Sequence, residues 1–185
     1  MRAFIDFEAS SLNDDGYPIE VGWVFEDGRS EAHLIKPAAR WVDWDEEAEA
    51  LHHISRAMLQ SGMPYDAVAR RLLDALAGHT VYASAPSWDG KWLSALLRAA
   101  GLPRHALRLR DSDEAQFEAA AEVLRPVVDP ARLESMAADI IERARTAIDQ
   151  SPPHHRALDD AKREWQVWLE VKRLAQEAVA KRQTS

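Results

Sequence analysis

The chain begins with strand-like segments joined by a tight turn, and this pattern constrains the fold more than any other feature. Residues 2–8 and 18–26 are rich in hydrophobic and β-branched side chains. The dipeptide Asp27-Gly28 then favours a short hairpin turn into residues 31–36. We therefore expect three antiparallel strands at the start of the fold.

After these strands, the hydrophobic pattern changes to an alternation of strands and helices. Further strands are expected at residues 79–84 and 106–111, and helices around residues 68–76, 92–97, 113–125, 130–148 and 158–169. This order predicts an α/β fold with a mixed five-stranded sheet flanked by helices. With 185 residues, we expect a single domain over residues 1–185, with a core of about residues 1–170 and a last helix reaching about residue 182.

Composition limits the chemistry that the chain can support. It contains no cysteine, so a bound metal must use oxygen or imidazole ligands. Its net charge of −8 disfavours binding of long nucleic acid through the phosphates alone. The amino-terminal residues lack an apolar targeting stretch, and no run approaches the length of a membrane span, so we expect a cytoplasmic protein with no membrane partner.

Two carboxylates, Asp6 and Glu8, interrupt the first strand-like segment. Residues two apart in a strand project from the same face, so both should point one way while Ile5 and Phe7 point the other. A divalent cation with oxygen ligands, such as Mg²⁺ or Mn²⁺, would relieve their repulsion. Two ordinary surface charges on an edge strand would give the same pattern.

Two later segments carry further groups of the same chemistry. Asp89 follows a short hydrophobic strand and opens a helix, where a carboxylate also complements the helix dipole. His155 and Asp160 lie five residues apart at the entry to the last helix. Histidine titrates near neutrality, which suits it to accepting a proton from water.

The order Asp-x-Glu, then Asp, then His-x-x-x-x-Asp resembles the catalytic signature of the DEDDh, or DnaQ-like, 3′–5′ exonuclease superfamily. The matching positions are Asp6, Glu8, Asp89, His155 and Asp160, and the stretch HRALDDA is similar to the third motif of the family. The resemblance extends from residue 4 to about residue 169 and implies a three-layer ribonuclease H-like fold.

The resemblance implies a two-metal-ion nuclease. Asp6, Glu8, Asp89 and Asp160 would hold two Mg²⁺ or Mn²⁺ ions, and His155 would accept a proton from the attacking water. The implied activity is hydrolysis of the terminal phosphodiester at the 3′ end of single-stranded or short RNA or DNA, with release of nucleoside 5′-monophosphates. RNA is weakly preferred by similarity to the small stand-alone members.

Some positions depart from the family pattern. The Thr-Thr-Gly that often follows the first Glu is replaced by Ala9-Ser10-Ser11, with Leu12 after it. The Asn and Phe of the second motif are replaced by Ala85 and Trp88. None of these changes touches a metal ligand, and the change from Phe to Trp is mild, but the loss of the Asn removes a polar contact that positions the substrate.

The resemblance also implies substrate-binding residues: Ala9 and Leu12, and, in the segment LHHIS, His53 and Ile54. A packing or capping role fits one of the two histidines of this segment equally well.

Other aromatic and histidine side chains leave alternatives open. Trp41 and Trp44 stand in an acidic loop whose setting suggests exposure, and either stacking on bases or an ordinary surface role fits them. His154 competes with His155 as the base, although it would require Asp159 rather than Asp160 as the ligand at the same spacing.

Two alternative functions remain at this stage. The protein is expected to be a DNA-repair or proofreading exodeoxyribonuclease if it prefers deoxyribose, and a metal-binding interaction module if it has lost catalysis. The last helix offers a surface for a homodimer, and its hydrophobic stripe fits packing within one chain equally well.

Overall fold

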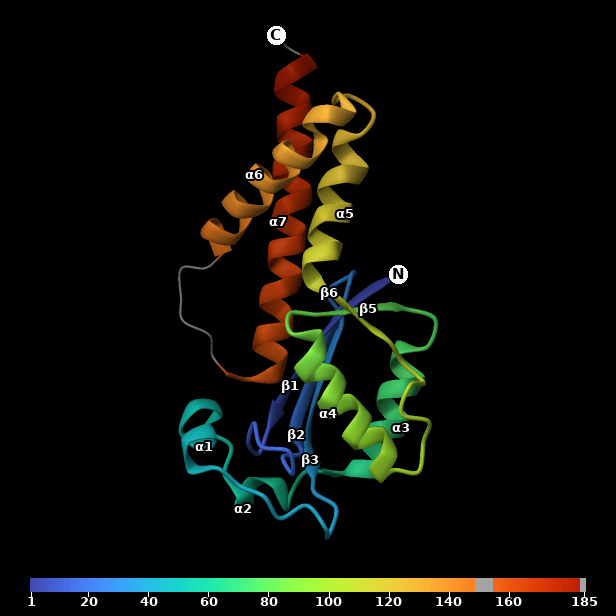
Figure 1. Cartoon of the computed structure of the whole chain (residues 1–185), viewed down its shortest axis with the longest axis vertical. Coiled ribbons are helices and arrows are strands. Elements are labelled where there is room, and N and C mark those ends of the chain that lie inside the picture. The colour runs from blue at the N-terminus through green and yellow to red at the C-terminus, as the bar shows by residue number, and fades with distance from the viewer. Residues whose placement is uncertain (149–154, 184–185) are drawn as a thin grey trace.

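A computed structural model of the chain describes residues 1–148 and 155–183. Within these residues, six strands form one mixed sheet in the order β4-β3-β2-β1-β5-β6 (Figure 1). The strands are β1 (Arg2–Ala9), β2 (Pro18–Phe25), β3 (Ser30–Lys36), β4 (Met63–Pro64), β5 (Thr80–Ala83) and β6 (Leu109–Asp111). The first three strands are antiparallel, and β5 and β6 continue the sheet parallel to β1. The predicted hairpin is confirmed, with Gly28 in the left-handed region (φ 88°).

The sheet has one strand more than the predicted five. The additional strand, β4, contains only Met63 and Pro64 and pairs in parallel with Ile35 and Lys36 of β3. A segment of this length cannot show the alternation by which strands are recognised, and a proline is confined to the edges of sheets. β4 lies at the edge of the sheet, where a proline is tolerated. Its short length is the reason that the sequence did not predict it.

Seven helices complete the described part of the chain. They are α1 (Glu46–His52), α2 (Arg56–Leu59), α3 (Tyr65–Leu76), α4 (Pro86–Ala99), α5 (Ser112–Leu124), α6 (Pro130–Ile148) and α7 (Ala157–Gln183). The longer helices agree closely with the hydrophobic spacing in the sequence. The short helices α1 and α2 lie in the segment between β3 and β4, where the sequence predicted no regular element.

The two faces of the sheet carry two separate hydrophobic clusters. Alternate residues of β1 divide between them, because successive side chains of a strand point to opposite faces. Ala3, Ile5 and Phe7 pack with α3 and α4, whereas Phe4 packs with α5, α6 and α7 and stacks on Tyr82 of β5 at 5.8 Å between ring centroids. The result is a three-layer arrangement with β1 near its centre.

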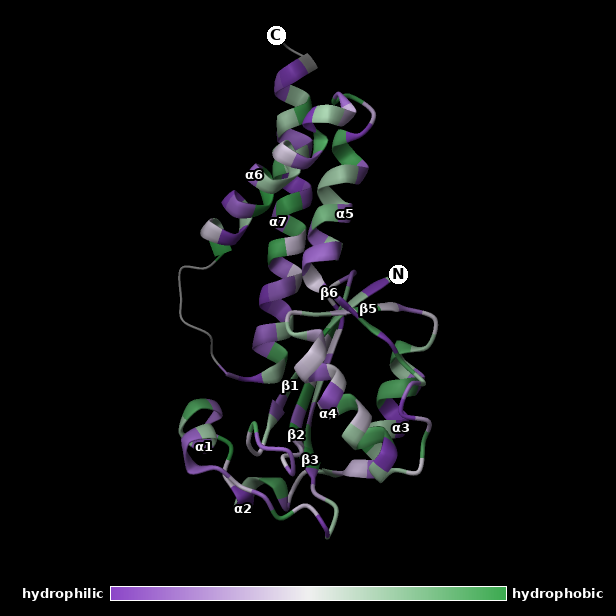
Figure 2. Ribbon diagram, in the orientation of Figure 1, coloured by the Kyte–Doolittle hydropathy of each residue, from purple (hydrophilic) through white to green (hydrophobic). Residues whose placement is uncertain are grey.

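Helices α5, α6 and α7 extend beyond the sheet as a bundle (Figure 1). Bands of hydrophobic and hydrophilic residues alternate along α6 and α7 (Figure 2), as expected of helices that bury one side. The buried side of α6 contributes Ala137, Ile140 and Ala144. The hydrophobic stripe of α7 is therefore used within the chain, against α5 and α6.

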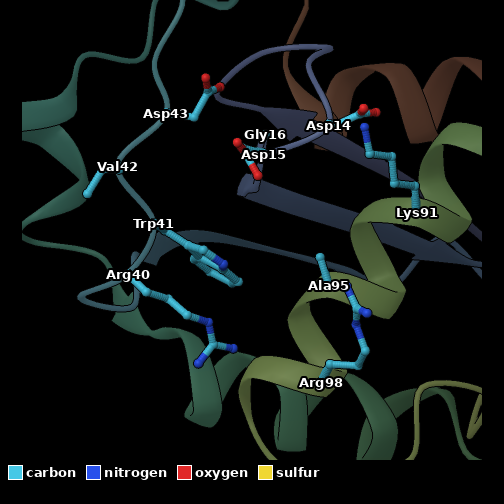
Figure 3. A pocket seen from close by; sticks show the side chains of 10 residues that line it. All are labelled: Asp14, Asp15, Gly16, Arg40, Trp41, Val42, Asp43, Lys91, Ala95 and Arg98. Atoms are coloured by element: carbon cyan, nitrogen blue, oxygen red, sulfur yellow. The ribbon is translucent and has the colours of Figure 1, made fainter.

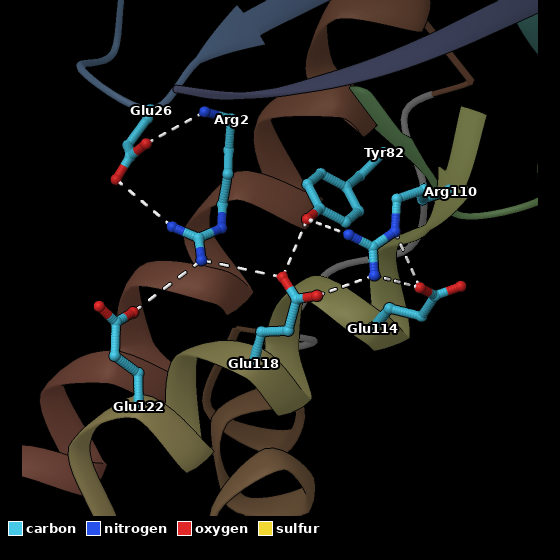
Figure 4. A network of polar contacts seen from close by, with 7 residues as sticks. All are labelled: Arg2, Glu26, Tyr82, Arg110, Glu114, Glu118 and Glu122. Carbon is cyan, nitrogen blue, oxygen red and sulfur yellow. Dashed lines mark hydrogen bonds and ion pairs between the residues drawn. The ribbon is translucent and has the colours of Figure 1, made fainter. Parts of the chain in front are cut away.

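A polar network joins the bundle to the sheet (Figure 4). Its centre is Glu118 of α5, which accepts hydrogen bonds from the Tyr82 hydroxyl at 3.0 Å and from Arg110 at 2.8 Å. Arg2 of β1 lies 3.8 Å from the same carboxylate, and its backbone N–H donates to Glu26. The network thus connects β1, β5, β6 and α5 where the hydrophobic cluster meets solvent.

Among the described residues, no helix is both long enough and hydrophobic enough to cross a bilayer.

Candidate active site

Asp6 and Glu8 lie in the second half of strand β1, and their side chains project from the face of the sheet that α7 covers. Opposite them on β2 lie Gly22 and Glu20, because the antiparallel register pairs Asp6 with Gly22 and Glu8 with Glu20. The pairing becomes irregular directly after Glu8. Irregularities of this kind re-aim side chains and are common beside active sites.

Asp160 reaches the same place from α7. It lies in the first turn of this helix, and carboxylate oxygens of Asp6, Glu8 and Asp160 lie within 4.8 Å of one another. Three carboxylates at this spacing provide the hard oxygen ligands that Mg²⁺ and Mn²⁺ prefer.

Asp89 approaches from the opposite layer through a gap in the sheet. β1 and β5 are paired only as far as Phe4 and Tyr82, so the β5 side of β1 is unpaired beyond that point. Asp89, in the first turn of α4, enters there and accepts a hydrogen bond from the backbone of Phe7. The carboxyl ends of parallel strands at a change of strand order are the usual place for ligands in α/β sheets.

The second oxygen of Asp89 supports the presence of a cation. Asp89 is only 3% exposed, and its Oδ2 has no hydrogen-bond partner among the described residues. A buried carboxylate oxygen without a partner is costly, and coordination to a cation would remove that cost. The residues therefore fit a divalent metal ion. Asp89 faces Asp6 closely enough to raise the pKa of Asp6.

The pKa shifts of the clustered carboxylates also indicate that the site fits a divalent cation. Burial raises the pKa of Asp6 well above its usual range, and the charges of Asp89 and Glu8 raise it further. Burial and the nearby Asp160 raise the pKa of Glu8 to about 8, and burial raises that of Asp89 to about 7. Without a cation, the site therefore disfavours full ionisation near neutral pH.

His155 borders the same cavity, which has a volume of about 410 Å³. Its lining includes Asp6, Glu8, Ser84, His155, Asp160 and Glu164. The His155 backbone has a φ of 50°, in the left-handed region that non-glycine residues seldom adopt. Such conformations persist only where surrounding contacts enforce them. The competing His154 lies outside the described residues.

Glu20 holds the two residues that directly follow His155. It is 3% exposed and accepts hydrogen bonds from the Arg156 guanidinium at 2.6 and 3.1 Å. The same carboxylate accepts a hydrogen bond from the backbone N–H of Ala157 at 3.0 Å, at the start of α7. One buried side chain of β2 therefore holds the residue after His155 and the first residue of the helix that carries Asp160.

Gly22 allows α7 to approach the sheet. A Cβ atom at this position would lie within 2.5 Å of the Cα atom of Leu158 and would also clash with the Leu158 backbone nitrogen. Only a residue without a side chain permits this approach. The start of α7 can therefore rest on β2 directly opposite Asp6.

The four residues predicted to bind substrate have different surroundings. Ala9 is partly buried at the end of β1. Leu12 is 69% exposed, in the loop that follows. His53 is exposed with a φ of 57° beside α1. Ile54 is completely buried in a cluster with Tyr17 and Leu59, so it presents no surface to a ligand, contrary to the prediction.

The two tryptophans of the acidic loop are less exposed than their setting suggested. Trp41 is partly buried and stacks on Tyr17 at 5.3 Å with an interplanar angle of 6°. Trp44 is also partly buried, and its Nε1 donates a hydrogen bond to Glu49 at 2.7 Å. Pairing with aromatic and acidic neighbours, which sequence proximity alone does not reveal, accounts for this burial.

Sequence analysis missed Glu20, Gly22 and Glu164 as parts of the site. Glu164 lies one helical turn after Asp160, and burial raises its pKa. Each had a detectable signal. A glutamate and a glycine inside an otherwise hydrophobic strand indicate a buried partner and a close backbone approach, and spacing of four residues places Glu164 beside Asp160.

A second, larger cavity lies along α4 (Figure 3). Its volume is about 760 Å³, and its lining includes Asp14, Arg40, Trp41, Asp43, Lys91 and Arg98. The walls come from the loop between β1 and β2, the loop after β3, and α4. We call it the α4 cleft.

Comparison with solved structures shows the fold. The chain matches exonuclease I from Methylocaldum szegediense at 18% identity and a TM-score of 0.66, over 95% of this chain and 41% of that protein. It matches the zinc-bound form of an E. coli exonuclease I complex with single-stranded DNA at 15% identity and a TM-score of 0.64, over 97% of this chain and 42% of that one.

A third match is a 3′-exonuclease that recognises the 3′ end of a histone mRNA stem-loop, at 15% identity and a TM-score of 0.62, over 95% of this chain and 63% of that protein. The chain therefore spans about two fifths to three fifths of the length of these proteins. The likeness confirms the predicted ribonuclease H-like fold of DnaQ-like 3′–5′ exonucleases. No family model and no curated protein matches the sequence.

Proposed function

We propose that the protein is a metal-dependent 3′–5′ exonuclease acting on single-stranded or short nucleic acid, with RNA weakly preferred. The observation that carries this proposal is the convergence of Asp6, Glu8 and Asp160 within 4.8 Å, beside the buried Asp89 with its unpartnered oxygen. The exonuclease fold around this cluster supports it.

The roles of the residues follow from their positions. Asp6, Glu8, Asp89 and Asp160 would hold two Mg²⁺ or Mn²⁺ ions, which when bound neutralise the phosphate and stabilise the attacking and leaving oxygens. His155, on the rim of the same cavity, would accept the proton of the water that attacks phosphorus. The bond from phosphorus to the 3′ oxygen of the preceding nucleotide breaks, and that oxygen takes up a proton from solvent. The products are a nucleoside 5′-monophosphate and a shortened strand with a 3′ hydroxyl.

Glu20 and Gly22 would act as positioning residues. Neither reaches the substrate in this scheme, because Glu20 is buried and engaged with Arg156 and Ala157. Their effect is to fix the distance between β1 and the start of α7, on which the separation of Asp6 and Asp160 depends.

An exodeoxyribonuclease of the repair or proofreading type is the second candidate. It is favoured by the matches to exonuclease I structures, one of which is a complex with single-stranded DNA. The match to a 3′-exonuclease of histone mRNA favours RNA instead. The 2′ hydroxyl distinguishes the two substrates, so a direct rate comparison decides between them.

The test is a time course with 5′-labelled single-stranded RNA and DNA of the same sequence, with Mn²⁺, with Mg²⁺ and with EDTA. The proposal expects metal-dependent shortening from the 3′ end with mononucleotide products, and no shortening by an Asp6→Asn/Asp160→Asn variant. Intact strands despite metal binding, measured separately by calorimetry, would contradict it and favour an interaction module without catalysis.

A further inference from the structure

The α4 cleft has opposite charges at its two ends (Figure 3). Arg40 and Arg98 lie at one end, on opposite walls. The carboxylates of Asp14, Asp15 and Asp43 lie at the other end, where Lys91 stands beside Asp14. Within residues 1–148 and 155–183, neither guanidinium group has an ion pair or hydrogen bond. Two guanidinium groups facing a shared space are suited to phosphate oxygens.

An aromatic ring lies between the two charged ends. Trp41 projects into the cleft (Figure 3), and one of its neighbours, Tyr17, is stacked parallel to it. The ring of Tyr65 is tilted against it at 5.6 Å. These contacts hold the indole in a fixed orientation, which suits it to stacking against the flat face of a base.

The cleft is connected to the candidate active site by two elements. The loop that leads from Glu8 past Leu12 supplies one wall. Helix α4 supplies another, with Asp89 in its first turn and Arg98 nine residues later. At a rise of about 1.5 Å and a rotation of about 100° per residue, Arg98 lies about 13.5 Å further along the helix axis than Asp89 and on the opposite side of the helix. A single strand whose 3′ end is at Asp89 would therefore have to reach Arg98 over the loop between β1 and β2, which also lines the cleft.

We propose that the α4 cleft binds a nucleotide of the substrate strand upstream of its 3′ end, with a base against Trp41 and phosphates at Arg40 and Arg98. This inference rests on the proposed exonuclease function. The carboxylates at the other end lie between the candidate active site and the arginines. They accept hydrogen bonds from amino or hydroxyl groups of the strand, and Lys91 beside Asp14 offsets part of their charge. The cleft lets a chain of net charge −8 hold nucleic acid through a local basic surface.

A binding experiment in EDTA tests the cleft separately from catalysis. Fluorescence anisotropy of a 5′-labelled 12-nucleotide single strand compares wild type with Arg40→Glu/Arg98→Glu. The matched control is Arg125→Glu/Arg132→Glu, which makes the same charge change at two exposed positions, one directly after α5 and one in the first turn of α6. We expect the dissociation constant to rise at least tenfold in the cleft variant and less than twofold in the control.

The salt dependence gives a second measurement. Loss of two phosphate contacts should make the slope of log affinity against log salt shallower by about 1.4, since each contact with a single strand contributes about 0.7. An affinity for the strand within twofold of the control would overturn the proposal. The proposal would also be overturned if the cleft variant bound the strand as tightly as wild type but no longer bound free nucleoside 5′-monophosphate. That result would assign the cleft to the product.

Substrate length links the cleft to turnover. The ratio of kcat/KM for the 12-nucleotide strand to that for a dinucleotide should fall at least tenfold in Arg40→Glu/Arg98→Glu, because a dinucleotide is too short to reach both ends. An unchanged ratio would overturn the strand path. If wild type hydrolyses neither substrate, the proposed function fails, while binding in EDTA still decides whether the cleft holds a strand.

Discussion

At the scale of single residues, the candidate site consists of carboxylates that are close together and largely buried. Asp6 comes from β1 within the sheet, Asp89 from α4 on one face, and Asp160 from α7 on the other. Such a cluster is a destabilising feature unless a cation neutralises it, because burial and mutual repulsion both disfavour ionisation. Metal binding requires these side chains to be ionised, whereas the stability of the metal-free fold favours their protonated forms.

Replacing Glu8 with Gln should stabilise the metal-free protein increasingly as pH rises from 5 to 8. The pKa of Glu8 is raised to about 8 in the folded state, above the 4.5 of an unperturbed glutamate. The folded state therefore holds the proton more strongly, and stability is lost as pH rises through that range. Gln cannot lose a proton and avoids this loss.

The measurement is the unfolding temperature of Glu8→Gln minus that of wild type, in EDTA, at several pH values. For a chain of this size, each kcal/mol corresponds to about 2–4 °C. Glu134→Gln, a change at an exposed position of α6, serves as the control and should show a constant difference. A difference for Glu8→Gln that shrinks as pH rises would contradict the buried acidic cluster.

Replacing His155 with Ala should slow turnover by about 10²–10⁴-fold, the usual contribution of a positioned base. Affinity for Mn²⁺, measured by calorimetry, should stay within twofold of wild type because the carboxylates remain in place. His154→Ala is the matched comparison and should retain most activity. If His154→Ala is the slower of the two variants, the proton acceptor has been assigned to the wrong histidine.

At the scale of elements, the site depends on how closely α7 approaches β2. Gly22 removes the steric obstacle, and Glu20 holds the first residues of the helix by three hydrogen bonds. Glycine inside a strand ordinarily weakens it, so its presence opposite Asp6 reflects this contact.

Gly22→Ala should therefore lower both stability and activity. The new methyl group must displace the backbone of α7, and overpacking of this kind costs about 1–3 kcal/mol. The matched control is Gly90→Ala in α4, where an added Cβ meets no atom within 4 Å. That change should be neutral or stabilising by about 0.5–1 kcal/mol, since alanine favours the helix. Equal unfolding temperatures for the two variants would refute the close contact.

Most of the elements could be predicted from the sequence because their hydrophobic periodicity reflects burial on one side. The acidic residues of the candidate site were named from their order and their placement at the ends of elements, and the structure brings Asp6, Glu8 and Asp160 together. Glu20, Gly22 and the gap between β1 and β5 were not recognised. The glutamate and the glycine inside β2 indicate an unusual contact, but the sequence does not identify the partner, which lies more than 50 residues away in each case. The burial of Ile54 was not predicted, because it results from packing against Tyr17, Ile19 and Leu59, which the fold brings together in one cluster.

At the scale of the whole molecule, the acidic cluster connects the first strand to the last helix. A divalent ion that binds only the folded state should stabilise the entire chain, by about 2.7 kcal/mol at a concentration of 100 times its dissociation constant. We expect Mn²⁺ to raise the unfolding temperature of wild type, and Asp160→Asn to lose most of this increase. An equal increase in both proteins would show that the ion binds elsewhere.

The contact between Glu20 and the Arg156–Ala157 segment joins residues 136 and 137 positions apart. During synthesis, β1 and β2 leave the ribosome long before α7 exists, so a nascent chain carries Asp6 and Glu8 without the element that completes their cluster. The acidic cluster can close only when α7 docks, as a late step of folding. A chain that stalls or is degraded before that step would not have assembled the proposed nuclease site, so incomplete copies of the protein would lack it.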